Sequence, residues 1–282
     1  MKHSNRLLLV SLGLVALTTL GMKQGVIFRR TLSAGDSQTY HMEFKSNQGI
    51  EMPDGSGKQH VTGTGSQDMT ESIDEVDSSG ESATVTIRLA NIKMDVDSPL
   101  GSAPKDFPSE ATSTATVDRR NRFTNVVLDP VLSKLFSDDT GVAAWGGGVE
   151  FPEGHVELGE SWDNWIPKMG MMSAGATLKA TLIASDTLNG VPVWEIHLKG
   201  EIPVDVDMSK MPMSSGNPLA GQPARMKGTL NVSSVIFLDR NTNLVVKSTT
   251  TTESKMNVIV PNMDIEMPVT GDTETTVTKV AG

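Results

Sequence analysis

Apolar and polar residues alternate along most of this chain, a pattern typical of β-strands that bury one face and expose the other. Between residues 38 and 44, for example, Tyr40, Met42 and Phe44 are two positions apart. β-Branched residues, which favour a pleated conformation, are frequent in the alternating segments. The pattern predicts strands over residues 38–44, 60–76, 83–96, 112–117, 123–128, 176–184, 191–206, 226–238, 244–260 and 265–280.

Short runs of turn-forming residues separate these strands. The pair Asn189-Gly190 predicts a two-residue hairpin turn. Residues 129–136 differ from the rest, because Asp129 is suited to cap a helix and Pro130 to occupy its first position. The apolar residues of this segment fall on one helical stripe, so we expect one short helix near the centre of the chain.

The second half of the chain repeats features of the first half. The segment 151–162 opens this second half, and short matching segments then follow in the same order and at similar spacing. We therefore expect a first β repeat at 32–148 and a second at 149–282, combined in one globular domain. The matched segments are 35–37 with 159–162, 77–80 with 186–190, 85–89 with 194–198, 95–97 with 205–207, and 117–121 with 238–241.

Several predicted strands are ten or more residues long, which exceeds the usual five or six. Long twisted strands tend to curl. The sequence thus predicts an all-β, internally duplicated fold in which long antiparallel strands form an open barrel or two packed curved sheets. Such a shape can enclose an apolar cavity.

Residues 1–21 have the pattern of an export signal. Lys2 and Arg6 provide a positive start, and the apolar run at 7–20 is too short to span a bilayer comfortably. Met22 stands where a lipid-anchored protein carries Cys. We expect an exported protein, periplasmic or secreted, with no lipid anchor and no transmembrane span in the mature chain. The competing interpretation is an uncleaved N-terminal anchor.

Composition excludes several classes of function. The chain has no Cys, which rules out disulfides, thiolate catalysis and thiolate metal sites. Its formal net charge is −10 and it has no basic block, which argues against nucleic acid and against electrostatic attachment to anionic lipid. The Gly-x-Ser-x-Gly element of α/β hydrolases is absent from the sequence.

The apolar faces of the long strands are the candidate ligand-binding surface. The candidate surface also includes two large aromatic residues near the centre of the chain, Trp162 and Trp194. Aromatic residues in this region either fill the space between the two halves or face a ligand. The strand residues that we expect to line an apolar pocket are Met42, Phe44, Ile87, Leu89, Ile196 and Leu198.

Two residue patterns are compatible with metal binding. Asp95 and Asp97 share one strand face, as do Asp205 and Asp207, because strand side chains repeat every two residues. If the halves pack symmetrically, these four carboxylates can converge on Ca²⁺ or another hard cation. The competing interpretation is a solvated strand end that resists edge pairing.

A methionine-rich loop provides the second pattern. Met208, Met211 and Met213 have the spacing M-x-x-M-x-M that soft Cu(I) can use. The competing interpretation is that these residues are flexible apolar fillers in a core or at the mouth of a pocket.

The segment Phe151-Pro-x-x-x-Val-x-x-Gly-Glu-Ser-Trp162 resembles an uncharacterised family of bacterial secreted proteins and lipoproteins, classed as a domain of unknown function. The family shares a Pro-x-x-x-Val-x-x-Gly-[Asp/Glu]-Ser-Trp segment amid β-strands. This resemblance implies an envelope location and a β-rich fold, and it implies no activity. The expected shape also looks like that of periplasmic lipoprotein carriers, half-barrels that shelter acyl chains.

These features favour a non-enzymatic extracytoplasmic domain that binds an apolar, lipid-like ligand or an envelope protein, with no cofactor. One alternative is a purely structural or protein-interaction module of the cell envelope. A second is copper handling through the methionine-rich loop. A third, an envelope hydrolase, would have to use carboxylates among Asp95, Asp97, Asp205 and Asp207.

Overall fold

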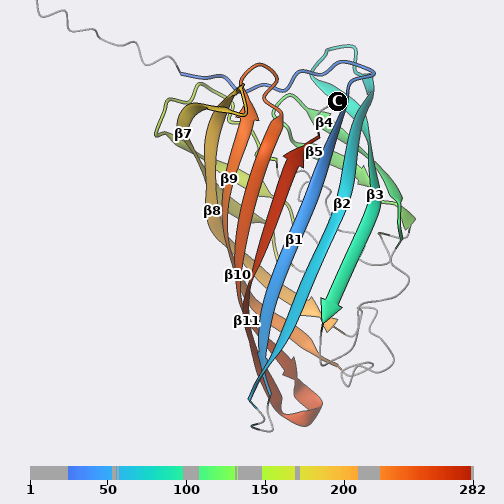
Figure 1. Cartoon of the computed structure of the whole chain (residues 1–282), viewed down its shortest axis with the longest axis vertical. Coiled ribbons are helices and arrows are strands. Elements are labelled where there is room, and N and C mark those ends of the chain that lie inside the picture. Colours follow the sequence, from blue (N-terminus) through green and yellow to red (C-terminus); the bar gives the residue numbers. More distant parts are fainter. Residues whose placement is uncertain are drawn as a thin grey trace, which may run out of the picture.

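A computed structural model of the chain describes residues 25–52, 55, 57–97, 108–130, 132, 148–168, 172–208 and 223–280. Eleven antiparallel strands form one curved sheet in the order β5-β4-β3-β2-β1-β11-β10-β9-β8-β7-β6 (Figure 1). The strands are β1 (Ser37–Glu51), β2 (Lys58–Val76), β3 (Ser82–Asp97), β4 (Ala111–Asp118), β5 (Phe123–Val127), β6 (Ser161–Ile166), β7 (Ala176–Leu188), β8 (Val191–Asp207), β9 (Arg225–Asp239), β10 (Val245–Val260) and β11 (Ile265–Lys279).

The sheet consists of two meanders that meet along one seam. Strands β1 to β5 form the first meander and β6 to β11 form the second. The seam is the pairing of β1 with β11, which runs from Tyr40 opposite Lys279 to Ile50 opposite Val269. The sheet is not closed, so β5 and β6 remain as its two edges. The structure therefore has one continuous open sheet and not two packed sheets.

The alternating pattern predicted the strands well, with one omission. Strand β6 was not expected, although Trp162, Asn164 and Ile166 alternate with exposed residues along it. The predicted hairpin turn between β7 and β8 is confirmed, and Asn189 and Gly190 both have positive φ, at 51° and 84°.

Two other expectations concern residues outside the described ranges. Of the helix expected at 129–136, only Asp129, Pro130 and Leu132 are described, so that helix is not confirmed. The export signal expected at 1–21 lies entirely outside the described part. Within the described residues, no helix combines the length and the apolar character needed to cross a membrane.

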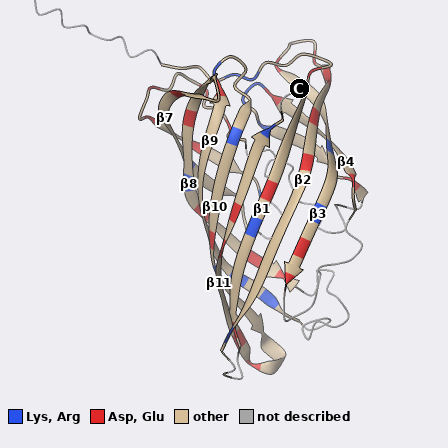
Figure 2. Cartoon of the chain, in the orientation of Figure 1, with Lys and Arg blue, Asp and Glu red and all other residues tan. Residues whose placement is uncertain are grey.

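Acidic and basic residues are interspersed along the strands (Figure 2). Several of them pair across neighbouring strands, as Lys179 does with Asp163. Exposed pairs of this kind contribute little to stability, roughly 0–1 kcal/mol each. Their arrangement indicates a solvated convex surface, with the apolar residues directed to the other face of the sheet.

The main hydrophobic core lies on the concave face. Buried residues from β3 and β4 belong to the same cluster as buried residues from β7 and β8, although these strand pairs lie far apart in the sheet order. The sheet must therefore curl so that its two flanks share one core. Examples are Val85 and Val117 from one flank and Leu182 and Ile196 from the other.

An aromatic plug, consisting of Phe28, Phe151, Trp162 and Trp194, fills one end of this core. Phe28 is 0% exposed, and its ring centroid lies 5.6 Å from that of Phe151, 6.0 Å from Trp162 and 6.3 Å from Trp194. Phe28 belongs to the segment 25–36, which runs across one end of the sheet before β1 (Figure 1).

Two glycines that the sequence had matched, Gly35 and Gly159, share local geometry. Their φ angles are 87° and 86°, and they lie just before β1 and β6 respectively. The Gly35 amide donates to the Ile73 carbonyl at 2.8 Å, and the Gly159 amide donates to the Leu182 carbonyl at 2.7 Å. One register shift follows directly after Ile73 in β2 and another directly after Leu182 in β7.

We predict that Phe28→Ala lowers the free energy of unfolding by about 3–5 kcal/mol, because it leaves a cavity between three aromatic rings. Urea denaturation followed by circular dichroism measures this loss. The matched control is Val127→Ala on edge strand β5, where the side chain is 64% exposed and the expected change is within about 0.5 kcal/mol. If Phe28→Ala lowers the free energy of unfolding by less than about 1 kcal/mol, the aromatic plug does not anchor the segment 25–36.

Candidate ligand-binding site

The strand register shows which residues share the concave face, and these residues form an apolar part and a polar part. Directly paired residues point to the same side of a sheet, so Tyr40 on β1 shares this face with Met69 on β2. On the other side of the seam, Leu198 on β8 shares it with Ser234 on β9, which in turn faces Thr250 on β10. The face thus changes from apolar residues to a group of hydroxyl side chains that includes Ser234 and Thr250, here called the hydroxyl band.

A cavity of about 450 Å³ opens on this face. Its apolar wall includes Met69, Leu178, Leu198, Ile202 and Val232. Part of the hydroxyl band forms another wall, where the Thr250 hydroxyl donates to the Ser234 Oγ at 2.8 Å and Thr252 lies beside them. The volume falls in the range of roughly 300–1,000 Å³ that is usual for small-molecule sites.

A buried ion pair lies at one end of the cavity. The Arg30 side chain is 4% exposed. Its Nη2 donates to Glu71 Oε1, and its Nη1 donates to Glu71 Oε2 at 3.3 Å and to Asn121 Oδ1 at 3.0 Å. Burial lowers the pKa of the Arg30 guanidinium. The Nε of Arg30 is buried and has no hydrogen-bond partner.

Tyr40 borders the same end of the cavity and is 5% exposed. No described residue forms a hydrogen bond with its hydroxyl group. Burial raises the pKa of Tyr40 to about 12, and the positive charge of Arg30 partly opposes that shift. The phenol is therefore a protonated hydrogen-bond donor at neutral pH.

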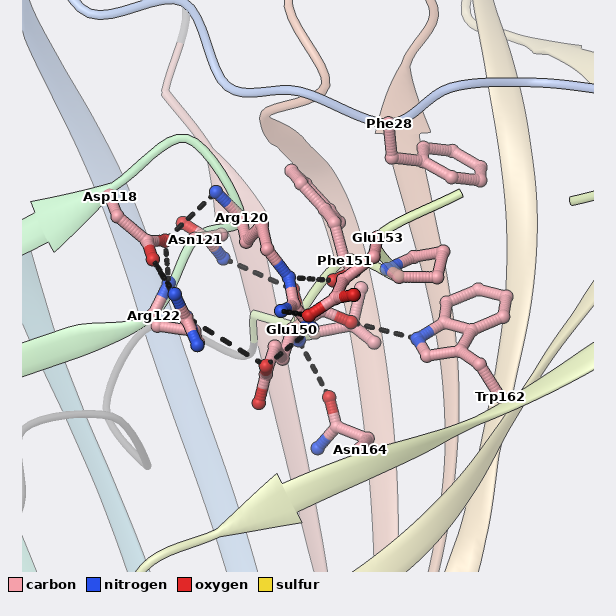
Figure 3. A network of polar contacts seen from close by, with 12 residues as sticks. Phe28, Asp118, Arg120, Asn121, Arg122, Glu150, Phe151, Glu153, Trp162 and Asn164 are labelled. Atoms are coloured by element: carbon pink, nitrogen blue, oxygen red, sulfur yellow. Dashed lines mark hydrogen bonds and ion pairs between the residues drawn. The ribbon is translucent and has the colours of Figure 1, made fainter. Parts of the chain in front are cut away.

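A second polar network, shown in Figure 3, fixes the segment that leads into β6. Arg120 Nη2 donates to Glu150 Oε1 at 2.9 Å, and the Glu150 amide donates to Asn164 Oδ1 at 2.6 Å. The Trp162 indole donates to the Glu150 carbonyl at 2.8 Å. Burial raises the pKa of Glu150, while Arg120 and Arg122 oppose the shift. The turn between β4 and β5 thereby holds Glu150 and Asn164 at the cavity wall.

Both free edges of the sheet border the cavity. Phe123 and Thr124 of β5 lie on one side, and Asn164, Trp165 and Ile166 of β6 lie on the other. The Trp165 side chain is 55% exposed. The cavity is therefore bordered by residues of both edge strands, which include two aromatic residues, and its apolar wall lies on other strands of the sheet.

The residues expected to line a pocket divide into three groups. Leu198 lines the cavity. Ile87, Leu89, Ile196 and Trp162 belong to the buried core cluster, against which Met42 and Trp194 pack. Phe44 instead borders a second, more open hollow of about 310 Å³, together with Gly65 and Met94.

Sequence reasoning missed the polar end of the cavity. Arg30, Glu71 and Asn121 come from three separate segments, and no local pattern links them. The only available signal was indirect, since Glu71 occupies a core-facing position of β2 between the buried Met69 and Ile73. A carboxylate in such a position requires a buried partner.

The four aspartates expected to converge on a metal ion do not do so. Within the described ranges, no group of three or more His, Asp or Glu side chains lies close enough to hold a metal. Strands β3 and β8, which carry the two Asp-Val-Asp segments, are separated by five other strands. Asp205 instead pairs with Arg225, which lowers the pKa of that carboxyl.

The methionine pattern cannot be placed as a unit. Met208 packs against a second buried cluster that contains Val258, Val260 and Met267. Met211 and Met213 lie outside the described residues. The packing of Met208 agrees with its interpretation as an apolar filler.

Comparisons with known proteins give little support for any family. No protein-family model matches the sequence, and no curated protein matches it. Among solved structures, the chain is similar to a DUF1329 family protein from Desulfovibrio piger ATCC 29098, with 8% identity, a TM-score of 0.21, and coverage of 86% of this chain and 84% of that chain. It is also similar to a putative outer membrane lipoprotein-sorting protein domain from Vibrio parahaemolyticus, with 10% identity, a TM-score of 0.14 and the same coverages, 86% and 84%. Similarities at this level carry no argument, so the family expected from residues 151–162 stays a prediction.

We predict that the single tyrosine of the chain, Tyr40, ionises with a midpoint near pH 12 in the folded protein. Absorbance at the tyrosinate band measures this midpoint directly, and the unfolded chain provides the control with an ordinary value near 10. Because the folded pKa is higher, the contribution of Tyr40 to stability is complete below pH 10 and is lost as the pH rises from about 10 to about 12. A folded-state midpoint near 10 would show that Tyr40 is open to solvent.

Proposed function

We propose that this protein is a non-enzymatic domain outside the cytoplasm that binds an apolar or amphipathic small molecule within its curved sheet. The observation that carries the proposal is the cavity of about 450 Å³ on the concave face. Protein interiors are packed nearly as densely as organic crystals, and voids larger than a water molecule are few. A space of this size therefore suits a ligand better than a core.

The lining supports an amphipathic ligand. Leu198, Ile202 and Val232 provide an apolar wall, and the Arg30–Glu71 pair provides a polar end. Filling the apolar part releases water from hydrocarbon surface, a gain of roughly 25 cal/mol for each Å² of apolar surface buried. The polar end then sets the direction in which a ligand lies.

The carboxylates beside the cavity favour binding over catalysis. Glu71 is engaged by Arg30, and Glu150 is engaged by Arg120. A general acid or base must exchange a proton with the substrate. Ion pairs with arginine hold these carboxylates in place and make such exchange costly, so they act as supports for the site.

A second candidate function is a structural or protein-interaction module of the envelope. The free edges of the sheet favour it, because an unpaired edge strand can accept a strand from another chain. Val127 on β5 and Trp165 on β6 are large apolar residues that stand exposed beside these edges. An envelope protein is the partner that this candidate requires.

We also infer that residues 32–148 and 149–282 are repeats and that residues 1–21 direct export. The paired glycine geometry at Gly35 and Gly159, and the register shifts at equivalent places in β2 and β7, support the repeat. The positively charged and then apolar start of the chain supports export.

The decisive experiment is native mass spectrometry of the mature chain purified from an envelope fraction, with organic extraction of any bound molecule. We predict an adduct of lipid-like mass. Val232→Phe, which fills the cavity, should weaken binding of the extracted molecule by about tenfold or more.

The matched control is Val235→Phe, which adds the same ring to the same strand β9 on the opposite face of the sheet. It should leave binding unchanged. A protein without any adduct that also fails to bind acyl-chain probes would contradict the proposal and leave the interaction module as the better candidate. An adduct with the mass of copper would instead favour copper binding through Met208 and the methionine-rich loop.

A further inference from the structure

The unused hydrogen-bonding capacity at the polar end of the cavity includes two donors, Arg30 Nε and the Tyr40 hydroxyl. Of the described residues, only two have a buried side-chain polar atom without a partner, and one of these atoms is Arg30 Nε. The Tyr40 hydroxyl, in the same wall, forms no hydrogen bond with a described residue, and unlike Arg30 Nε it is not fully buried, so it is open to the cavity. A buried donor without an acceptor is costly, so such groups in native structures require an explanation.

The neighbouring acceptors are already used. Asn121 Oδ1 accepts from Arg30, and Asn164 Oδ1 accepts from the Glu150 amide. Both carboxylate oxygens of Glu71 accept from Arg30. What this end of the cavity lacks is an acceptor that the described residues do not provide.

The charges at this end are balanced. Arg30 is paired with Glu71, and Arg122, which also lines the cavity, lies near Glu150 with an N···O distance of 3.9 Å. A further charge brought into this buried site would have no counter-charge, and burial of an unpaired charge is strongly unfavourable. The missing acceptor is therefore uncharged.

We propose that the Arg30–Tyr40 end of the cavity binds the carbonyl oxygen of an ester or amide in an acyl-chain ligand, while the chain itself lies against Leu198, Ile202 and Val232. This inference rests on the proposed function and gives the class of ligand. Met69, directly opposite Tyr40 in the neighbouring strand, begins the apolar surface along which the acyl chain continues.

The test uses three probes with twelve carbon atoms in the chain, namely methyl dodecanoate, dodecanoate and dodecane, each competing with a fluorescent acyl probe at pH 7. The ester should bind the wild-type protein roughly five- to tenfold more tightly than the alkane, the ratio that one hydrogen bond provides. It should also bind more tightly than the carboxylate.

Two variants assign this preference to the polar end. Tyr40→Phe removes the hydroxyl and keeps the ring, so the ratio of ester to alkane affinity should fall. The double variant Arg30→Met/Glu71→Met replaces the whole ion pair by apolar side chains of similar length. It should bind the ester no more tightly than the alkane, while the alkane still binds. The matched control is Thr252→Val, which removes a cavity hydroxyl away from this end and should keep the ratio.

The outcomes separate the two proposals. If none of the three probes binds, the proposed function is wrong. If all three bind equally, or if dodecanoate binds most tightly, the cavity holds apolar chains but the carbonyl assignment is wrong. An ester preference that survives in both Tyr40→Phe and the double variant would also overturn the assignment, because the selecting donor would then lie elsewhere.

Discussion

The pairing of β1 with β11 is the interaction on which the rest of the structure depends. It joins the two meanders, so that eleven strands act as one sheet with only two edges. Because the strands are long and the sheet curls, its flanks approach each other and share a core. The cavity exists because the concave side of that curl is wider than the side chains of the flanks can fill.

The segments outside the sheet close one end of this curl. Phe28 lies before β1 and Phe151 lies before β6, and their rings pack together inside the curl of the sheet. Arg30, two residues after Phe28, is thereby carried to the cavity wall, where it meets Glu71 of β2. Glu150, directly before Phe151, also lies at the cavity wall and is held by Arg120. The plug and the polar groups of the site thus depend on the same two segments.

Period-two alternation was sufficient to predict the strands, because burial of one face constrains every second residue. It missed β6, which is short and lies at an edge, so that only Trp162 and Asn164 are well buried. The site was less predictable. Leu198 follows from the pattern, whereas the Arg30–Glu71 pair joins residues 41 positions apart in the sequence. The strand order, which decides which of these residues meet, is not encoded in any local pattern. The sequence likewise suggested that Asp95 and Asp205 meet, whereas Asp205 pairs with Arg225 on the neighbouring strand.

The seam also has a consequence for how the chain folds. Its strands begin at Ser37 and end at Lys279, so they are separated by most of the length of the chain. Contacts of such long sequence separation form slowly, because the entropy of closing the loop must be overcome first. Because a chain is synthesised from its N-terminus, β1 is exposed long before β11 is available to pair with it. During that interval the seam edge of β1 is an unpaired strand, because the pairing of β2 with β1 covers only its other edge.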